Sequence, residues 1–274
     1  MSEVVIRAIH LRKTFRDYKS NLQKMKHMLV LSGAGEKNNV FSNVSFEIKK
    51  GEKVAIILDS GIGKTSLMRL LAGIITPEKG RVEVNGRLTS ILDYRCGFDN
   101  SLTVQDNYEI ACALLGWPRD VTEQRQEEIL EAAGLTQMKE QPLRICKAAG
   151  ANRLGFNIHT YEKPDILIFD EGFSFGSKKL NSKYVKRLKE IVSDPEVTLV
   201  MSANSTAIAG KLCTRGIVIH NGKVEFDGDY EEALAYHKEN PDPKSDRMKA
   251  EAEPEEESNE SAAAEGADNG SVII

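Results

Sequence analysis

The chain has 274 residues, of which 41% are hydrophobic, and a formal net charge of −4. A chain of this length and composition can bury one sizeable core, so one main globular unit is expected. No stretch approaches the roughly 18 apolar residues of a membrane span, and the charged N-terminus predicts no signal peptide. The cysteines form no C-x-x-C pair, which indicates free thiols rather than a disulfide framework or a zinc ribbon; they are Cys96, Cys112, Cys146 and Cys213.

The first elements are two strands separated by a helical segment. A strand is predicted at Val4 to Ile9, and the alternation of apolar residues from Val40 to Ile48 predicts a half-buried strand. Between them, residues 18–35 contain Ser20 and Gln23 at capping-box spacing and apolar residues on one helical face. We expect a short amphipathic helix there, which packs either on its own domain or on a membrane subunit or anionic lipid.

A strand, a loop and a helix follow in the order that a phosphate-binding unit needs. The continuous apolar run Val54 to Leu58 is typical of a central parallel strand covered on both faces. After a glycine-containing loop, the apolar spacing from Lys64 to Ile74 predicts a helix. A strand ending at Val84 then precedes Asn85-Gly86, a dipeptide that predicts a β-hairpin turn.

The second half of the chain alternates helices and buried strands. Helices are predicted within residues 103–134, and strands at Ile166 to Phe169, Val197 to Met201, Gly216 to His220 and Lys223 to Phe226. Residues 241–274 differ, because they hold ten acidic and three basic residues, a net charge of −7, and few apolar side chains to offset their ordering entropy. We expect a folded domain at 1–240 and a disordered acidic tail at 241–274. The tail is either a solvating extension or a docking or regulatory arm.

The strongest motif runs from Leu58 to Thr65 and matches the phosphate-loop pattern G-x-x-x-x-G-K-[ST] except at its first position. In such a loop, backbone N–H groups and the helix N-terminus cradle the β-phosphate, Lys64 neutralises phosphate oxygens, and the Thr65 hydroxyl binds Mg²⁺. Leu58 replaces a glycine, so the backbone either avoids positive φ or accepts about 1 kcal/mol or more of strain. Asp59 either brings a negative charge toward the polyphosphate or points to solvent. Weakened affinity for the nucleotide is therefore expected.

Two acids follow a buried strand about a hundred residues later. Asp170 at the strand tip is suited to hold Mg²⁺ through water, and Glu171 is suited to orient and polarise the water that attacks the γ-phosphate. Taken alone, two acids after a strand indicate a solvated edge. Together with the phosphate loop they predict a Mg-ATP site.

These segments resemble an ABC ATPase. The resemblance rests on Lys64 to Ile74 (KTSLMRLLAGI), on Pro77 to Gly80 and on residues 218–229. More narrowly, Ser90 to Gly116 is similar to the nucleotide-binding subunits of O-antigen, capsule and teichoic-acid exporters. The resemblance implies an α/β P-loop NTPase core with a mainly parallel sheet, an antiparallel β subdomain and a helical subdomain at about residues 100–160.

The resemblance also implies roles for single residues. Phe15 would stack on adenine, Thr65 and Asp170 would bind the metal, and Glu171 would be the catalytic residue. Asp93 falls at a further position that reaches Mg²⁺ in the family, although its short side chain suits a surface turn. The phosphate-binding residues would be Leu58, Asp59, Ser60, Gly61, Ile62, Gly63, Lys64, Thr65 and Ser66.

The chain departs from the family pattern at three places. The signature motif, which binds the γ-phosphate held by the opposite subunit, reads Cys146 to Asn152 without a serine, so one hydrogen bond of about 1.5–3 kcal/mol is missing. Ala203 occupies the position of the switch histidine, and Ser177 that of an aspartate that communicates across the dimer. Hydrolysis is therefore expected to be slow.

The five histidines of the chain are predicted to be surface or packing residues: His10, His27, His159, His220 and His237.

The function implied by the resemblance is that of an ATP-binding exporter subunit at the cytoplasmic face of the cell membrane. Such a subunit binds Mg-ATP, with slow hydrolysis or none, to drive export of a polysaccharide or lipid-linked glycan. Its partners would be a multispanning permease and a second ABC ATPase subunit, in a homodimer or a heterodimer. The alternative is a catalytically weak regulatory or scaffolding protein. A nucleic-acid partner is not expected, because residues 1–240 carry a net charge of only +3 and no strongly basic patch.

Overall fold

The computed structural model describes residues 3–17, 36–59, 61–92, 97–170, 177–203 and 206–243. The predicted amphipathic helix at 18–35 and residues 244–274 of the predicted tail lie outside these ranges. The described strands are β1 (Val4–Asp17), β2 (Glu36–Lys49), β3 (Lys53–Ile57), β4 (Lys79–Val84), β5 (Leu88–Ile91), β6 (Ile166–Phe169), β7 (Thr198–Ala203), β8 (Arg215–His220) and β9 (Lys223–Asp229). The helices are α2 (Lys64–Leu71), α3 (Val104–Leu114), α4 (Arg119–Ala133), α5 (Lys147–His159), α6 (Lys178–Val192), α7 (Thr206–Leu212) and α8 (Tyr230–Glu239), with 3-10 turns at Thr136–Met138 and Leu143–Cys146.

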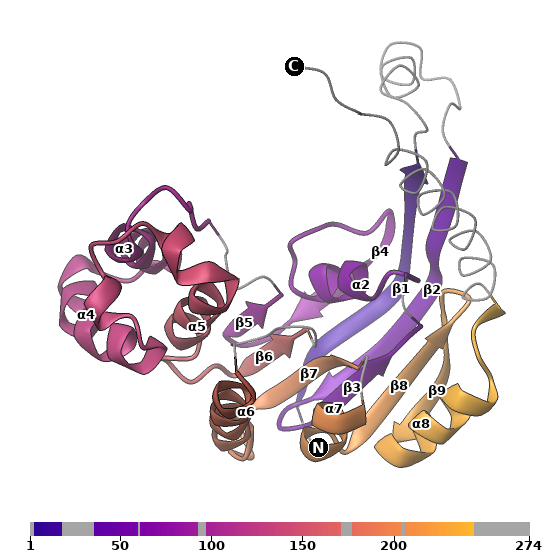
Figure 1. Cartoon of the computed structure of the whole chain (residues 1–274). Coiled ribbons are helices and arrows are strands. Elements are labelled where there is room, and N and C mark those ends of the chain that lie inside the picture. Colours follow the sequence, from indigo (N-terminus) through magenta and orange to yellow (C-terminus); the bar gives the residue numbers. More distant parts are fainter. Residues whose placement is uncertain are drawn as a thin grey trace, which may run out of the picture.

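The strands form one sheet in the order β4-β1-β2-β9-β8-β3-β7-β6-β5 (Figure 1). From β8 to β5 all neighbours are parallel, whereas β9 is antiparallel to β8. At the other edge β1 is antiparallel to both β2 and β4. The predicted fold class, a mainly parallel core with an antiparallel β part, is confirmed.

Residues of the central strands alternate between two cores, as the period of a strand requires. Val54 and Ile56 of β3 face a core that also contains α2 and the inner faces of β1 and β2. Ala55 and Ile57 face the opposite core, which is covered by α6, α7 and α8. Because β3 is covered on both faces, its run of apolar residues is explained, and the loop that follows it starts from a rigid strand.

Helices α3, α4 and α5 form a group beside the sheet with a core of their own (Figure 1). A capping box fixes the start of α3: the Thr103 side chain accepts the Asp106 N–H at 3.0 Å, and the Asp106 carboxylate accepts the Thr103 N–H at 3.1 Å. Tyr108 is fully buried in this core, and its hydroxyl donates to the Thr122 carbonyl at 2.7 Å.

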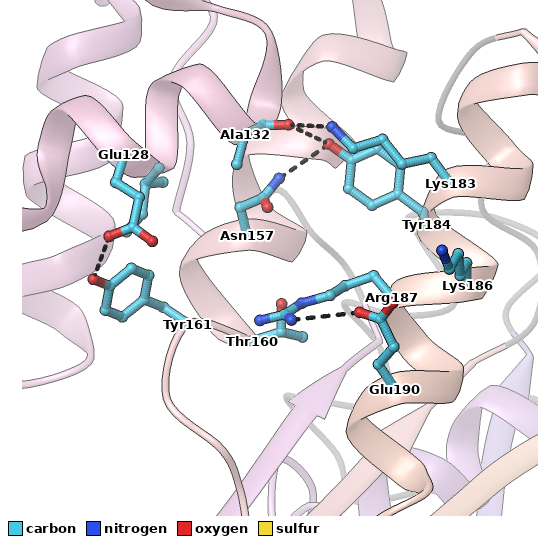
Figure 2. A pocket seen from close by; sticks show the side chains of 11 residues that line it. Glu128, Ala132, Asn157, Thr160, Tyr161, Lys183, Tyr184, Lys186, Arg187 and Glu190 are labelled. Atoms are coloured by element: carbon cyan, nitrogen blue, oxygen red, sulfur yellow. Dashed lines mark hydrogen bonds and ion pairs between the residues drawn. The ribbon is translucent and has the colours of Figure 1, made fainter.

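A tyrosine of α6 links this group to the sheet. The Tyr184 hydroxyl accepts the Asn157 amide N–H at 3.0 Å and donates to the Ala132 carbonyl at 3.1 Å (Figure 2). Its ring also packs edge-on against Phe156 of α5, with 5.1 Å between the centroids, and the side chain is almost fully buried. One residue of α6 therefore contacts both α4 and α5, and it lines an open cleft together with residues of these three helices.

The hairpin predicted at Asn85-Gly86 is wrong. β4 pairs with β1 at one edge of the sheet, and β5 pairs with β6 at the opposite edge. Gly86 has a positive φ of 119°, as a turn residue, but the Arg87 N–H that follows donates to the Asp165 carboxylate at 2.7 Å. This long-range contact sends β5 alongside β6, where Ile91 is buried.

The described part of the chain contains no helix long and apolar enough to cross a lipid bilayer.

Near the end of the described part, Pro241, Asp242 and Pro243 belong to the segment that composition assigned to the tail. Asp242 is only 1% exposed. The contacts of the folded domain thus continue past residue 240.

Candidate functional site

The phosphate loop connects β3 to α2 and begins without strain. Leu58 is 2% exposed and packs in the core between β3 and α2. Within the described residues, His10 and Asn221 are the non-glycine residues with positive φ. The Leu58 backbone therefore takes the first of the two predicted courses and avoids the left-handed region. An apolar side chain at this position adds to the core instead of straining the loop.

The two glycines of the loop do adopt left-handed backbone. Gly61 has φ 83° and Gly63 has φ 96°. A Cβ atom on Gly63 would lie 2.0 Å from Val40 Cγ1 of β2 and 3.3 Å from Phe41 Cζ. Both the backbone conformation and the close approach of β2 therefore require glycine here.

The N-terminus of α2 is suited to bind an anion. Its N-cap is Gly63, which makes no side-chain capping bond. The first helical residue, Lys64, is 8% exposed, while the next residue, Thr65, is exposed. Uncapped N–H groups, the positive end of the helix dipole and a lysine together form an anion site of the kind that holds phosphate.

An oxygen cluster lies where β6, β7 and α2 meet. The Thr65 hydroxyl donates to Asp170 Oδ2 at 3.4 Å, and the Ser202 hydroxyl donates to Asp170 Oδ1. Thr65 and Asp170 are 105 positions apart in the sequence, and the fold brings them together as predicted. Carboxylate and hydroxyl oxygens beside a phosphate site suit Mg²⁺, which takes one or two protein oxygens together with phosphate oxygens and water. Among the described residues no group of three or more His, Cys, Asp or Glu forms a denser metal site.

Ser202 was missed at the sequence level. It is fully buried in β7, one residue before the position of the switch histidine. Its hydroxyl orients the Asp170 carboxylate from the side opposite Thr65. A polar residue inside the apolar run of β7 is a signal that could have revealed this role.

Asp59 behaves in neither of the predicted ways. Its carboxylate accepts the Asp242 N–H at 3.0 Å and lies 3.5 Å from His237 Nε2. Its charge is therefore directed at the C-terminal end of the described chain. The prediction that His220 and His237 are ordinary surface or packing residues is incomplete, since His237 touches a residue of the phosphate loop.

Phe15 presents an exposed ring on β1, which pairs with the strand that approaches the loop. It is 37% exposed, and the Lys13 ammonium lies 5.5 Å from its ring centroid. Phe15 pairs with Asn38 across β1 and β2, and Asn38 precedes by two residues the Val40 that touches Gly63. Two residues of a strand span about 7 Å. The backbone of Phe15 is therefore close along the sheet to the part of β2 that approaches Gly63, and its role toward adenine stays a prediction.

The three departures from the family pattern have definite places. Ala148, Ala149 and Gly150 stand in the first turn of α5, whose N-cap, Cys146, makes no side-chain capping bond. Ala203 ends β7 and pairs with Ile57 of β3. A helix start and a strand end are thus available where the family has its signature and its switch, but the chain places no hydroxyl and no imidazole there.

Ser177 has a structural role of its own. It is the N-cap of α6, and its hydroxyl accepts the Leu180 N–H at 3.4 Å.

Three predicted site residues cannot be placed, because Ser60, Asp93 and Glu171 lie outside the described residues. Ile62 is buried and Ser66 partly buried in and after the loop.

Fold and site together define a P-loop nucleotide-binding protein of the ATP-binding cassette class. The family model described as ABC transporter matches residues 41–174, from β2 to just past Asp170. The O-antigen export system ATP-binding protein RfbB of Klebsiella pneumoniae is 32% identical over 205 residues, which are 75% of this chain and 83% of RfbB. The chain belongs to the ABC transporter ATP-binding family.

Two further comparisons extend this result. The teichoic acids export ATP-binding protein TagH of Bacillus anthracis is 28% identical over 230 residues, which are 84% of this chain but 42% of TagH. The chain therefore spans less than half of the length of that relative. Among solved structures, the dimeric post-hydrolysis state of the cassette MJ0796 with ADP and Pi has a TM-score of 0.65 at 18% identity, over 82% of this chain and 98% of that one. At this identity the similarity shows the fold alone.

Proposed function

We propose that this chain is the ATP-binding subunit of an exporter for a polysaccharide or a lipid-linked glycan. One observation carries the proposal: a buried lysine at an uncapped helix start lies beside the Thr65–Asp170–Ser202 oxygen cluster. The named relatives are ATP-binding proteins of O-antigen and teichoic acid export, and they match the chain over most of its length. The cargo class rests on those relatives.

The residues would act on Mg-ATP as follows. Backbone N–H groups from Gly61 to Ser66 would hold the β-phosphate, and Lys64 would neutralise the β- and γ-oxygens. Thr65 and Asp170 would hold Mg²⁺, which supplies charge neutralisation at the phosphates. Phe15 would stack on the adenine, and Glu171 would polarise the attacking water.

Subunit organisation follows from the same proposal. As an ATP-binding subunit like its named relatives, the chain would act with a separate multispanning permease and would bind it at the cytoplasmic face. Residues 1–240 would form the cassette, with the helical subdomain at about 100–160, and the acidic segment would follow it. Each ATP would lie between the phosphate loop of one subunit and the start of α5 in another, in a homodimer or a heterodimer.

Turnover by this chain would be slow. The missing imidazole at Ala203 leaves the γ-phosphate without that partner, and the missing signature serine removes a hydrogen bond of about 1.5–3 kcal/mol across the dimer. A partner subunit that supplies a complete signature motif would restore activity. The protein purified alone should therefore show little ATPase activity, and addition of its permease and partner should raise it.

Two experiments test the proposal. Affinity purification from native membranes should recover a multispanning protein; recovery of a stable complex without any membrane protein would overturn the exporter assignment. Glu171→Gln should abolish the remaining turnover while MgATP binding persists. If the native chain and Glu171→Gln are equally inactive in the assembled complex, the chain binds nucleotide in a regulatory or scaffolding role.

A further inference from the structure

The Asp59 carboxylate, in the phosphate loop, is bound by the C-terminal end of the described chain. Asp59 Oδ2 accepts the Asp242 backbone N–H at 3.0 Å, across 183 positions of sequence. Asp59 Oδ1 lies 3.5 Å from His237 Nε2, and the two side chains are 23% and 17% exposed. Both carboxylate oxygens therefore have partners outside the loop.

The C-terminal partners of Asp59 are themselves fixed on the core. The buried Asp242 carboxylate accepts the Asn221 N–H at 2.7 Å, in the turn between β8 and β9. His237 Nδ1 lies 2.9 Å from Nε2 of the buried His220. These contacts attach His237 of α8 and Asp242 to the end of β8 and the turn that follows it, beside Asp59.

The same cluster borders the phosphate site. Burial lowers the pKa of His237; the Asp59 carboxylate opposes this shift, whereas His220 and the Lys64 ammonium add to it, so His237 interacts electrostatically with both Asp59 and the phosphate-binding lysine. Asp59 stands five residues before Lys64 in the same loop. A carboxylate free to turn toward a bound triphosphate would repel it, because both groups are anionic and partly shielded from water.

We infer that the C-terminal segment, through the Asp242 N–H and the His237 ring, holds the Asp59 carboxylate away from the nucleotide and thereby keeps the phosphate loop competent for ATP. Asp59 is a negative charge that the loop tolerates only while this clamp is closed. Binding of MgATP and docking of Pro241 to Pro243 are then thermodynamically linked, and each favours the other. This inference rests on the proposed ATP-binding function.

The test uses full-length variants and MgATP titrated by calorimetry at low salt. Asp242→Pro deletes the N–H that Asp59 accepts and also the carboxylate that accepts the Asn221 N–H, so it opens the clamp at both of these contacts. The position before Pro243 suits the extended backbone that proline requires. We expect MgATP to bind this variant at least about fivefold more weakly, because the released carboxylate faces the phosphates. The loss should shrink at about 0.5 M salt, where such repulsion is screened. Lys238→Ala, on the exposed side of α8, is the matched control and should bind as the native chain does.

The decisive variant combines Asp242→Pro with Asp59→Asn. If the clamp acts by restraining a charge, the double variant should bind MgATP within about twofold of Asp59→Asn alone, since no carboxylate remains to be released. Equal affinity of Asp242→Pro and the native chain would overturn the inference. So would a double variant as weak as Asp242→Pro, since a structural defect is not rescued by removal of a charge.

Two further arms keep the result interpretable. If circular dichroism shows that Asp242→Pro is unfolded, His237→Leu with and without Asp59→Asn replaces it and is judged by the same rescue. If the native chain binds no MgATP at all, the proposed function fails. If the native chain binds and the variants match it, only the clamp fails.

Discussion

Gly63→Ala is the most informative single change in the phosphate loop. Gly63 combines a left-handed backbone with a strand at close range, since its φ is 96° and a Cβ would come within 2.0 Å of Val40 Cγ1. The left-handed conformation costs a non-glycine residue about 1–2 kcal/mol. Overpacking against β2 adds about 1–3 kcal/mol. The free energy of unfolding should therefore fall by about 2–5 kcal/mol.

A second glycine separates the two contributions. Gly73 has a similar φ of 70°, but a Cβ there would meet nothing within 4 Å. Gly73→Ala should lose only the backbone term, about 1–2 kcal/mol. Urea denaturation followed by circular dichroism measures both variants under the same conditions.

A suppressor tests the named contact. Val40→Ala removes the Cγ1 atom that an alanine at position 63 would strike, so Gly63→Ala with Val40→Ala should be less destabilised than the sum of the two single changes by about 0.5 kcal/mol or more. If Gly63→Ala and Gly73→Ala cost the same, or if the two changes are additive, β2 does not constrain the loop as described.

Three further changes probe other parts of the structure. Tyr184→Phe removes two part-buried hydrogen bonds at the junction of α4, α5 and α6, so the free energy of unfolding should fall by about 1–3 kcal/mol. Tyr161→Phe, whose single hydrogen bond is exposed, should cost less than about 1 kcal/mol in the same urea titration (Figure 2). Burial lowers the pKa of His159 below 6.5. The contribution of His159 to the free energy of unfolding is therefore complete above pH 6.5 and is lost as the pH falls. His159→Gln should reduce the difference between the free energies of unfolding measured at pH 7 and at about pH 5. Ser202→Ala removes the hydroxyl that orients Asp170, so the Mg²⁺ concentration needed for nucleotide binding should rise about tenfold. An unchanged Mg²⁺ requirement would mean that Asp170 is oriented without the Ser202 hydroxyl.

The central part of the site could be predicted because its signals are local. In the sequence, a buried strand, a glycine loop and a helix follow one another directly from β3 to α2, and a second buried strand, β6, ends at Phe169, just before Asp170. Parallel strands of one sheet bring their carboxyl ends to the same edge. The proximity of Thr65 and Asp170 therefore followed from two local patterns and one general rule of topology.

The errors arose where a distant contact decides the outcome. Asn85-Gly86 favours a hairpin locally, but the Asp165 carboxylate captures the Arg87 N–H from 78 positions away and directs β5 to the far edge. The fate of Asp59 depends on Asp242, which composition assigned to a disordered tail. Neither pairing has a periodicity or spacing that a single sequence reveals.

The phosphate loop shows how a deviation from a motif can be neutral for the fold. Leu58 stands where the pattern has glycine, yet the described backbone keeps ordinary φ there, and the side chain joins the buried residues around α2. Gly61 and Gly63 retain the left-handed conformations. The positions that need glycine have it, and the position that lost it packs an apolar side chain.

The measurement that tests the central claim most directly is equilibrium binding of MgATP to the purified chain and to Lys64→Ala. The account predicts saturable binding that requires Mg²⁺ and weakens at least about tenfold in Lys64→Ala, because one charge-assisted contact to the phosphates is lost. Lys189→Ala, on the exposed surface of α6, should bind as the native chain does. Absence of binding by the native chain, or equal binding by Lys64→Ala, would contradict the account.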